Sequence, residues 1–120
     1  MSEYQNNAVK LMDLKAGRES LLNAKDRREE FIRQSLELYY AMGGEWECIQ
    51  PIAEKVYSNQ PTRIDIAVGN VMYKLAAIGH VSDIDIIQAA YNKLDEARQN
   101  MSTSGNGHDP NGSVAKIPGG

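Results

Sequence analysis

The middle of the chain, about residues 27–100, has apolar residues spaced three and four positions apart, which is the spacing of amphipathic helices. The pattern predicts four helices, over about 27–42, 47–57, 63–78 and 83–99. The second has the cleanest apolar stripe, made of Ile49, Ile52, Ala53, Val56 and Tyr57. Since each periodic segment fits a helix, the sequence predicts an all-α fold.

Turn signals separate the first three helices. Gly43-Gly44 ends the first helix, because glycine is a common residue just after a helix C-terminus. A polar turn at residues 58–61 separates the second helix from the third. Thr62 followed by Asp65 resembles a capping box and is expected to start the third helix.

The third helix is expected to be buried along one stripe, made of Ile64, Val68, Val71, Met72 and Leu75. Gly79 is expected to end this helix, and Val81 to anchor the exit of the chain in the core. Ser82 with Asp85 offers an N-cap for the fourth helix. That helix is expected to bury Ile87, Ala90, Tyr91 and Leu94.

The two ends of the chain differ from this middle part. Residues 1–26 are predicted to form an extra N-terminal helical arm, which Gly17 weakens and which orders against a partner or the main domain. Residues 101–120 are rich in Gly, Ser, Asn and Pro and are expected to form a disordered tail. The helical domain is expected over residues 27–100, with a helix-turn-helix-like core of three to four helices.

Length and composition exclude several classes of protein. The chain has 120 residues, a formal net charge of −3 and a single cysteine. These values argue against a histone-like polycation and against a disulfide-stabilised secreted domain. The apolar runs are too short for a transmembrane helix, and the first residues lack the apolar stretch of a signal peptide. We therefore expect a cytoplasmic protein with no membrane partner.

The second and third predicted helices carry a family resemblance. Ile52-Ala53 in the second helix and the run from Val71 to Val81 resemble the helix-turn-helix of winged-helix DNA-binding proteins. The resemblance covers about residues 28–82 and implies that the third helix is a recognition helix. No hairpin that could form a wing follows it. We therefore expect a form without the wing, whose last helix over 83–99 pairs with a second copy in a homodimer.

The face of the third helix opposite its apolar stripe is the predicted DNA-binding site. Asparagine can read adenine with two hydrogen bonds, and arginine and lysine reach phosphates or guanine. The predicted DNA-binding residues are Gln60, Thr62, Arg63, Asn70, Tyr73 and Lys74. The alternative is that these side chains only solvate an exposed face. The charge of −3 over residues 36–57 argues for contacts with protein rather than with DNA.

A second family resembles the later part of the domain. Residues 67–99 are similar, without gaps, to the last helices of all-α nucleotide pyrophosphohydrolases of the MazG type. That family binds magnesium through two pairs of acidic residues, which the resemblance places at Gln34 and Glu37 and at Ala67 and Asn70. Only Glu37 is a carboxylate, and magnesium needs charged oxygen ligands. The resemblance therefore implies a non-catalytic helical module that binds and modulates a protein partner, without a metal or other cofactor.

Other reactive residues suggest no further chemistry. Cys48 has no histidine in a nucleophile motif and is expected to be a buried structural thiol. His80 is expected to cap a helix or lie at the surface, and His108 falls in the tail. These residues do not have the spacing of a zinc site. We therefore predict no enzyme activity and no metal site.

The two resemblances predict two functions. By the first, the chain is a small DNA-binding protein that regulates transcription or replication as a homodimer. By the second, it is a protein-interaction module. Its small size, acidic balance and polar tail suit an accessory protein of a phage or mobile element.

Overall fold

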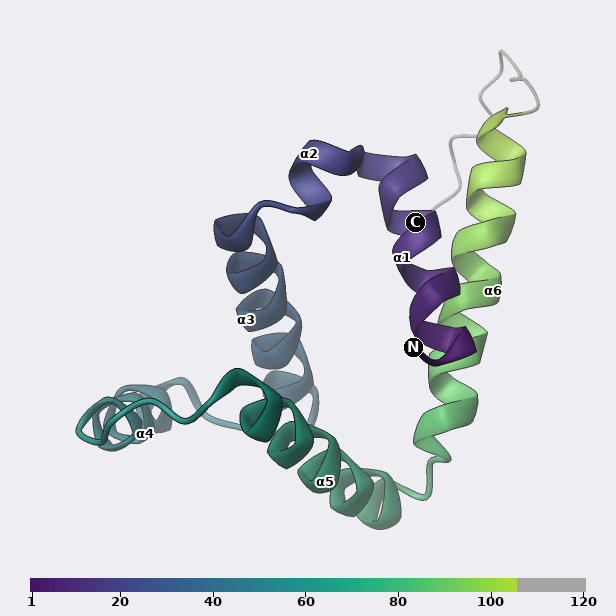
Figure 1. The fold of residues 1–120 in the computed structure, drawn as a ribbon. Coiled ribbons are helices and arrows are strands. Elements are labelled where there is room, and N and C mark those ends of the chain that lie inside the picture. Colours follow the sequence, from purple (N-terminus) through teal and green to yellow (C-terminus); the bar gives the residue numbers. More distant parts are fainter. Residues whose placement is uncertain (106–120) are drawn as a thin grey trace. The chain divides into compact units, whose positions relative to one another are not determined.

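The computed structural model describes the backbone of residues 1–105 and the side chains of residues 1–101, and the regular structure in this part is helical (Figure 1). This confirms the predicted all-α fold. The helices are α1 (Glu3–Ala16), α2 (Arg18–Leu21), α3 (Ala24–Ala41), the 3₁₀ helix η1 (Trp46–Cys48), α4 (Ile49–Tyr57), α5 (Ile64–Ser82) and α6 (Ile86–Gly105). The rest of the predicted tail, residues 106–120, lies outside the described residues. Within the described part, no helix combines the length and the apolar character needed to cross a bilayer.

Side-chain caps start three of the helices. Ser2 before α1 and Asn23 before α3 each accept a hydrogen bond from the backbone N–H three residues later, at 3.1 and 2.9 Å. Asp85 before α6 accepts two, from the N–H groups of Ile87 and Gln88, each at 3.0 Å. These bonds satisfy donors that the first helical turn leaves without an intrahelical partner.

The start of α5 differs from the predicted capping box. Residues 58–63 are not helical, so α4 and α5 are separate helices as expected. The helix begins at Ile64, and the Asp65 carboxylate accepts the backbone N–H of the next residue at 2.9 Å. The same carboxylate binds the Arg63 guanidinium at 2.7 Å. Arg63, not Thr62, is therefore the residue just before the helix, and its carbonyl accepts the N–H of Ala67 at 2.9 Å.

Gly79 does not end α5, as the sequence predicted, but lies inside the helix. The chain leaves the helix through Asp83, whose φ of 60° is left-handed. The N–H of Ile84 donates to the Gly79 carbonyl at 2.8 Å and that of Asp83 to the His80 carbonyl at 3.3 Å, which are the two bonds of a Schellman motif. A Cβ at Gly79 would lie 2.7 Å from Cγ2 of Ile86 and 2.8 Å from the Ile84 carbonyl oxygen. Glycine is needed at this position for close approach, not for a turn.

We expect Gly79→Ala to lower the free energy of unfolding by about 1–3 kcal/mol, because the added methyl group must displace a backbone carbonyl and a packed side chain. Gly69 is the matched control in the same helix, where a Cβ would meet no atom within 4 Å. Gly69→Ala should raise the free energy of unfolding by about 0.5–1 kcal/mol. Urea denaturation followed by circular dichroism measures both. Equal shifts of the same sign would contradict the role assigned to Gly79.

The end of α3 uses the same motif, at the glycine pair where the sequence predicted it. Gly43 has a φ of 91°, and the N–H of Gly44 donates to the Tyr39 carbonyl at 2.9 Å. The Tyr39 ring lies against Gly44, where any Cβ would overlap it. Its hydroxyl donates to the Glu45 carbonyl at 3.0 Å. Tyr39 thus fixes the turn that leads from α3 to η1.

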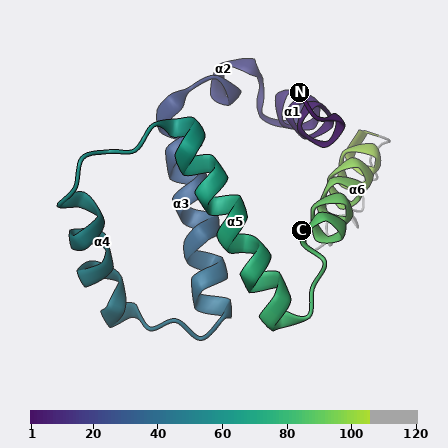
Figure 2. The same cartoon turned by 60° about the horizontal axis from the view of Figure 1, so that its bottom comes forward.

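The chain divides into two compact units. The first unit consists of Met1–Leu21 and the chain from Gly79 onward, and the second unit of Leu22–Ile78. In the first unit, α1 lies along α6 and runs in the same direction (Figures 1 and 2). The residues along this seam recur at spacings of three and four, as in a coiled coil, and include Tyr4, Ala8, Leu11, Lys15, Leu94, Ala97 and Met101.

Leu94 is the centre of the first unit. It is 4% exposed and is the buried hydrophobic residue of the described part. The rings of Tyr4 and Tyr91 meet edge to face beside it, with centroids 5.3 Å apart. Two residues that the sequence analysis placed in the core, Val81 and Ile87, are exposed instead. The N-terminal arm covers the α6 surface around Leu94.

The second unit, residues 22–78, has no buried residue. No Cα atom of α4 lies within 8 Å of one in α3 or α5, and α4 stands apart from both helices in two views (Figures 1 and 2). The apolar face of α4 therefore lies open, with Val56 and Tyr57 both exposed. The prediction that the α5 stripe packs on the first two helices is wrong for Ile64, Val68 and Met72, which are 82%, 57% and 49% exposed.

Candidate functional site

A groove of about 580 Å³ lies between α3 and α5 in the second unit. We call it the α3–α5 groove, and its lining residues are Phe31, Gln34, Ser35, Leu38, Asn70, Val71, Lys74, Leu75 and Ile78. No two Cα atoms of α3 and α5 lie within 8 Å of each other, so side chains rather than backbone close the space between them. The lining is mainly apolar, and Lys74 carries its single charge. Such a surface suits an amphipathic helix that carries an acidic residue.

Two of the predicted DNA-binding residues, Asn70 and Lys74, line this groove together with Val71 and Leu75. The sequence analysis placed them on the face opposite the apolar stripe. They lie instead toward α3, because positions three and four apart share one side of a helix. The Lys74 ammonium is 5.7 Å from the centroid of the Tyr73 ring, within the range of a cation–π contact.

The other predicted DNA-binding residues lie at the start of α5 and just before it. Gln60 and Thr62 belong to the non-helical segment between α4 and α5, and both are exposed. The Arg63 guanidinium forms two hydrogen bonds with the Asp65 carboxylate, at 2.7 and 3.2 Å. This pair neutralises the charge that would otherwise meet a phosphate. Its side chains are exposed, so the pair is weak and can exchange partners.

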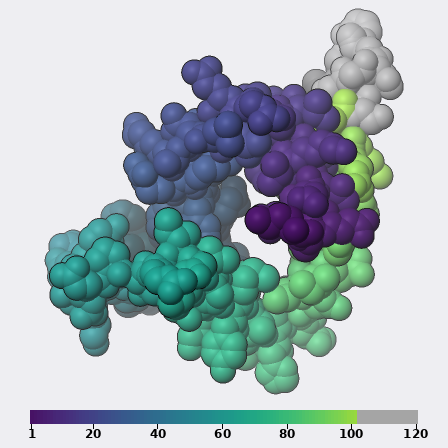
Figure 3. All heavy atoms as spheres, in the orientation of Figure 1, coloured from purple at the N-terminus to yellow at the C-terminus, as the bar shows by residue number. Residues whose placement is uncertain are grey.

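The side of α5 away from the groove is apolar from Ile66 to Ala76, and the Asp65 carboxylate lies on the same side at the start of the helix. We call it the outer face, and it consists of Ile66, Gly69, Met72, Tyr73 and Ala76. The large side chains of this set are exposed, and Figure 3 shows part of α5 at the surface of the second unit. Together with the apolar residues of the groove, the outer face makes α5 apolar on nearly every side. Helices of this kind are normally buried.

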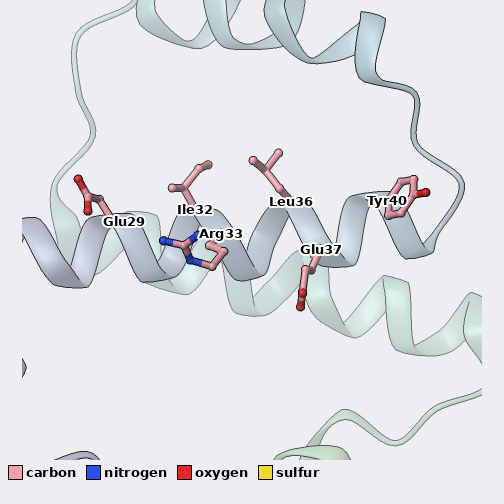
Figure 4. A pocket seen from close by; sticks show the side chains of 6 residues that line it. All are labelled: Glu29, Ile32, Arg33, Leu36, Glu37 and Tyr40. Atoms are coloured by element: carbon pink, nitrogen blue, oxygen red, sulfur yellow. The ribbon is translucent and has the colours of Figure 1, made fainter. Parts of the chain in front are cut away.

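The surface of α3 carries a shallower hollow of about 440 Å³ (Figure 4). Ile32, Leu36 and Tyr40 project from one side of the helix there, and Glu29, Arg33 and Glu37 complete the lining. The charges on α3 are of both signs, as expected for a solvated helix face. The exposed Ile32 and Leu36 show that this face also presents apolar surface.

Cys48 is exposed, which corrects the prediction of a buried thiol. Tyr39 lies close to it, and desolvation, followed by the negative charge of the Cys48 thiolate, raises the pKa of Tyr39 above its ordinary value of 10.0. A raised pKa favours the neutral phenol. Because the folded chain disfavours the phenolate, the free energy of unfolding falls as the pH rises from about 10 through the raised pKa.

The positions that the pyrophosphohydrolase resemblance assigns to magnesium ligands do not form a carboxylate site. Gln34 and Asn70 both line the α3–α5 groove, whereas Glu37 lines the hollow of α3. Ala67 has no ligating side chain. Among the described residues, no group of three His, Cys, Asp or Glu side chains is placed to hold a metal ion.

Comparisons with protein-family models, curated proteins and solved structures found no match to this chain. The candidate site therefore rests on two surfaces of the second unit, the α3–α5 groove and the outer face of α5. The outer face was not predicted from the sequence. Its signal was available in the run from Ile66 to Gly79, where Asn70, Tyr73 and Lys74 are the only polar side chains.

Proposed function

We propose that the chain is a non-catalytic helical interaction module that binds a protein partner through the outer face of α5. The observation that carries the proposal is that α5 is apolar on nearly every side and yet exposed in the single chain. Covering apolar surface contributes about 25 cal/mol per Å². A partner with an uncharged, apolar helical surface therefore gains by packing on this face, as is typical of exposed apolar patches.

The charge of the second unit favours protein over DNA as the partner. Residues 22–78 contain seven Lys and Arg residues and eight Asp and Glu residues. Most DNA-binding domains instead carry a basic surface, because phosphate contacts supply much of their affinity. The outer face contains no cation of its own, and the charge nearest to it on α5 is the Asp65 carboxylate, which would repel a phosphate. Asn70 and Lys74 lie on the groove side of α5 rather than on this face.

DNA binding is the second candidate, and one observation favours it. Gln60, Thr62 and Arg63 are exposed together at the N-terminal end of α5. The N-terminus of a helix attracts anions, and arginine adds a phosphate contact. In this function, the chain would regulate transcription or replication, and Arg63 would exchange its Asp65 partner for a phosphate.

We further propose that the module is cytoplasmic and has no catalytic activity. The exposed thiol of Cys48 suits a reducing compartment, which favours the cytoplasm. Amides and a methyl group stand at three of the four magnesium-ligand positions implied by the pyrophosphohydrolase resemblance. These side chains favour a binding role over phosphate hydrolysis.

A photo-crosslinker at the outer face tests the proposal. We expect Tyr73→benzoylphenylalanine, irradiated in the cells that produce the protein, to give a covalent adduct with a protein that resists nuclease digestion. The same crosslinker at Gln99, an exposed position on α6, is the control and should not give this adduct. A nuclease-sensitive adduct would favour the DNA-binding candidate. The absence of any adduct specific to Tyr73 would contradict both the surface and the function.

A further inference from the structure

Two complementary surfaces of the second unit do not meet within the chain. The apolar face of α4, which includes Ile52, Val56 and Tyr57, is exposed. The α3–α5 groove is apolar as well, but no Cα atom of α4 comes within 8 Å of one in α3 or α5. The apolar face of α4 could therefore pack in an α3–α5 groove, but it does not do so within one chain.

We propose that two copies of the chain associate by placing α4 of each copy in the α3–α5 groove of the other. Every copy carries both surfaces, so one two-fold arrangement covers two grooves and two α4 helices at once. This places the homodimer contact in the second unit. The sequence analysis expected it on residues 83–99, where α1 already covers the surface around Leu94.

The lengths of the two surfaces agree. α4 has nine residues, which corresponds to about 13 Å of helix at about 1.5 Å per residue. The α5 side of the groove extends from Asn70 to Ile78 and therefore has the same length. On α4, the apolar positions recur at spacings of three and four, which is the pattern read by a helix-binding groove.

One direction of docking pairs opposite charges. Lys74 is the charged residue of the groove. The apolar face of α4 has Glu54 on one flank and Lys55 on the other. We place α4 in the direction that brings the Glu54 carboxylate to the rim where Lys74 lies, with Lys55 on the flank away from this contact. In this direction Glu54 exchanges its present partner, the Gln50 amide, for Lys74 of the other copy.

Both surfaces expose large apolar side chains. On α4, Ile52, Val56 and Tyr57 are 55%, 62% and 87% exposed. In the groove, Phe31 and Val71 are 56% and 40% exposed. Docking of α4 would cover both sets, and the two-fold arrangement does so twice.

Charge reversal in separate chains tests this exchange of α4 helices between two copies. Lys74→Glu and Glu54→Lys each place like charges at both contacts of the dimer, so each variant alone should raise the dimer dissociation constant about 10-fold. An equimolar mixture of the two variants should form a heterodimer with near wild-type affinity, because opposite charges then meet at both contacts. Sedimentation velocity measures the dissociation constants, and circular dichroism checks that each variant keeps its helices.

The mixture separates exchange from closure within one chain. If α4 instead docked in the groove of its own chain, a chain carrying both Lys74→Glu and Glu54→Lys would regain wild-type behaviour. The mixture of the two single variants would not regain it, because each chain would still place like charges together. That result would overturn the exchange. Wild-type affinity in both single variants would overturn the contact between Glu54 and Lys74. Neither result bears on the outer face of α5, so the proposed function is tested separately by the crosslinker at Tyr73.

Discussion

Replacing Leu94 with alanine is expected to lower the free energy of unfolding of the first unit by about 2–5 kcal/mol. Leu94 is 4% exposed and lies on the seam between α1 and α6. The neighbouring Ala97 and Ala8 are too short to fill the cavity that the shorter side chain would leave. Since small domains have total stabilities of about 5–15 kcal/mol, we expect α1 to separate from α6 at a much lower urea concentration.

The matched control for this substitution is Leu14→Ala in α1, where the leucine is 67% exposed. An exposed side chain of this kind should change the free energy of unfolding by no more than about 0.5 kcal/mol. Urea titration followed by circular dichroism compares the two variants. Equal destabilisation by both would contradict the placement of Leu94 in the seam.

Met72→Glu is expected to reduce binding of the protein partner about 100-fold. The substitution places an unpaired carboxylate in the apolar part of the outer face, two turns after Asp65, and a buried unpaired charge costs several kcal/mol in an interface. In the free chain Met72 is 49% exposed, so the stability of the variant should stay within about 0.5 kcal/mol of the wild type. The yield of the protein adduct from a crosslinker at position 73 measures the binding.

Two further variants control this result. Met72→Leu keeps the size and apolar character of the side chain and should preserve the adduct. Gln99→Glu adds the same charge to α6 and should also preserve it. The dimer dissociation constant should not change in Met72→Glu, because the α3–α5 groove lies on another side of α5. Loss of the adduct in all three variants would show that the effect is not specific to the outer face.

The ends of α3 and α5 show how far turn residues could be predicted. Gly43 occupies the left-handed position after α3, which is the usual place for glycine, and the prediction of that end is confirmed. At the end of α5 an aspartate, Asp83, adopts the left-handed conformation instead. The helix therefore continues beyond Gly79, whose burial against Ile84 and Ile86 depends on contacts outside the local sequence.

The candidate site could be predicted only in part, because periodicity shows that a face is apolar but not what covers it. The stripe of α4 was visible in the sequence, yet Ile52, Val56 and Tyr57 are exposed and no Cα atom of α4 lies within 8 Å of one in α3 or α5. On α5 the sequence analysis took one stripe as buried and the opposite face as polar. Asn70 and Lys74 instead share a side with Leu75, and the apolar outer face lies elsewhere on the helix. Which side of α5 faces α3 depends on tertiary packing, and the local sequence does not determine it.

The central claim is that other chains cover the second unit. Hydrogen–deuterium exchange of the wild-type chain at several protein concentrations tests this claim most directly. Backbone amides of α4 and α5 should exchange quickly in dilute protein and become protected as the concentration rises. The amides of α6 around Leu94 should be protected equally at all concentrations, because α1 covers them within the chain. Protection of α4 and α5 in dilute protein to the same degree as α6, with no dependence on concentration, would contradict the account.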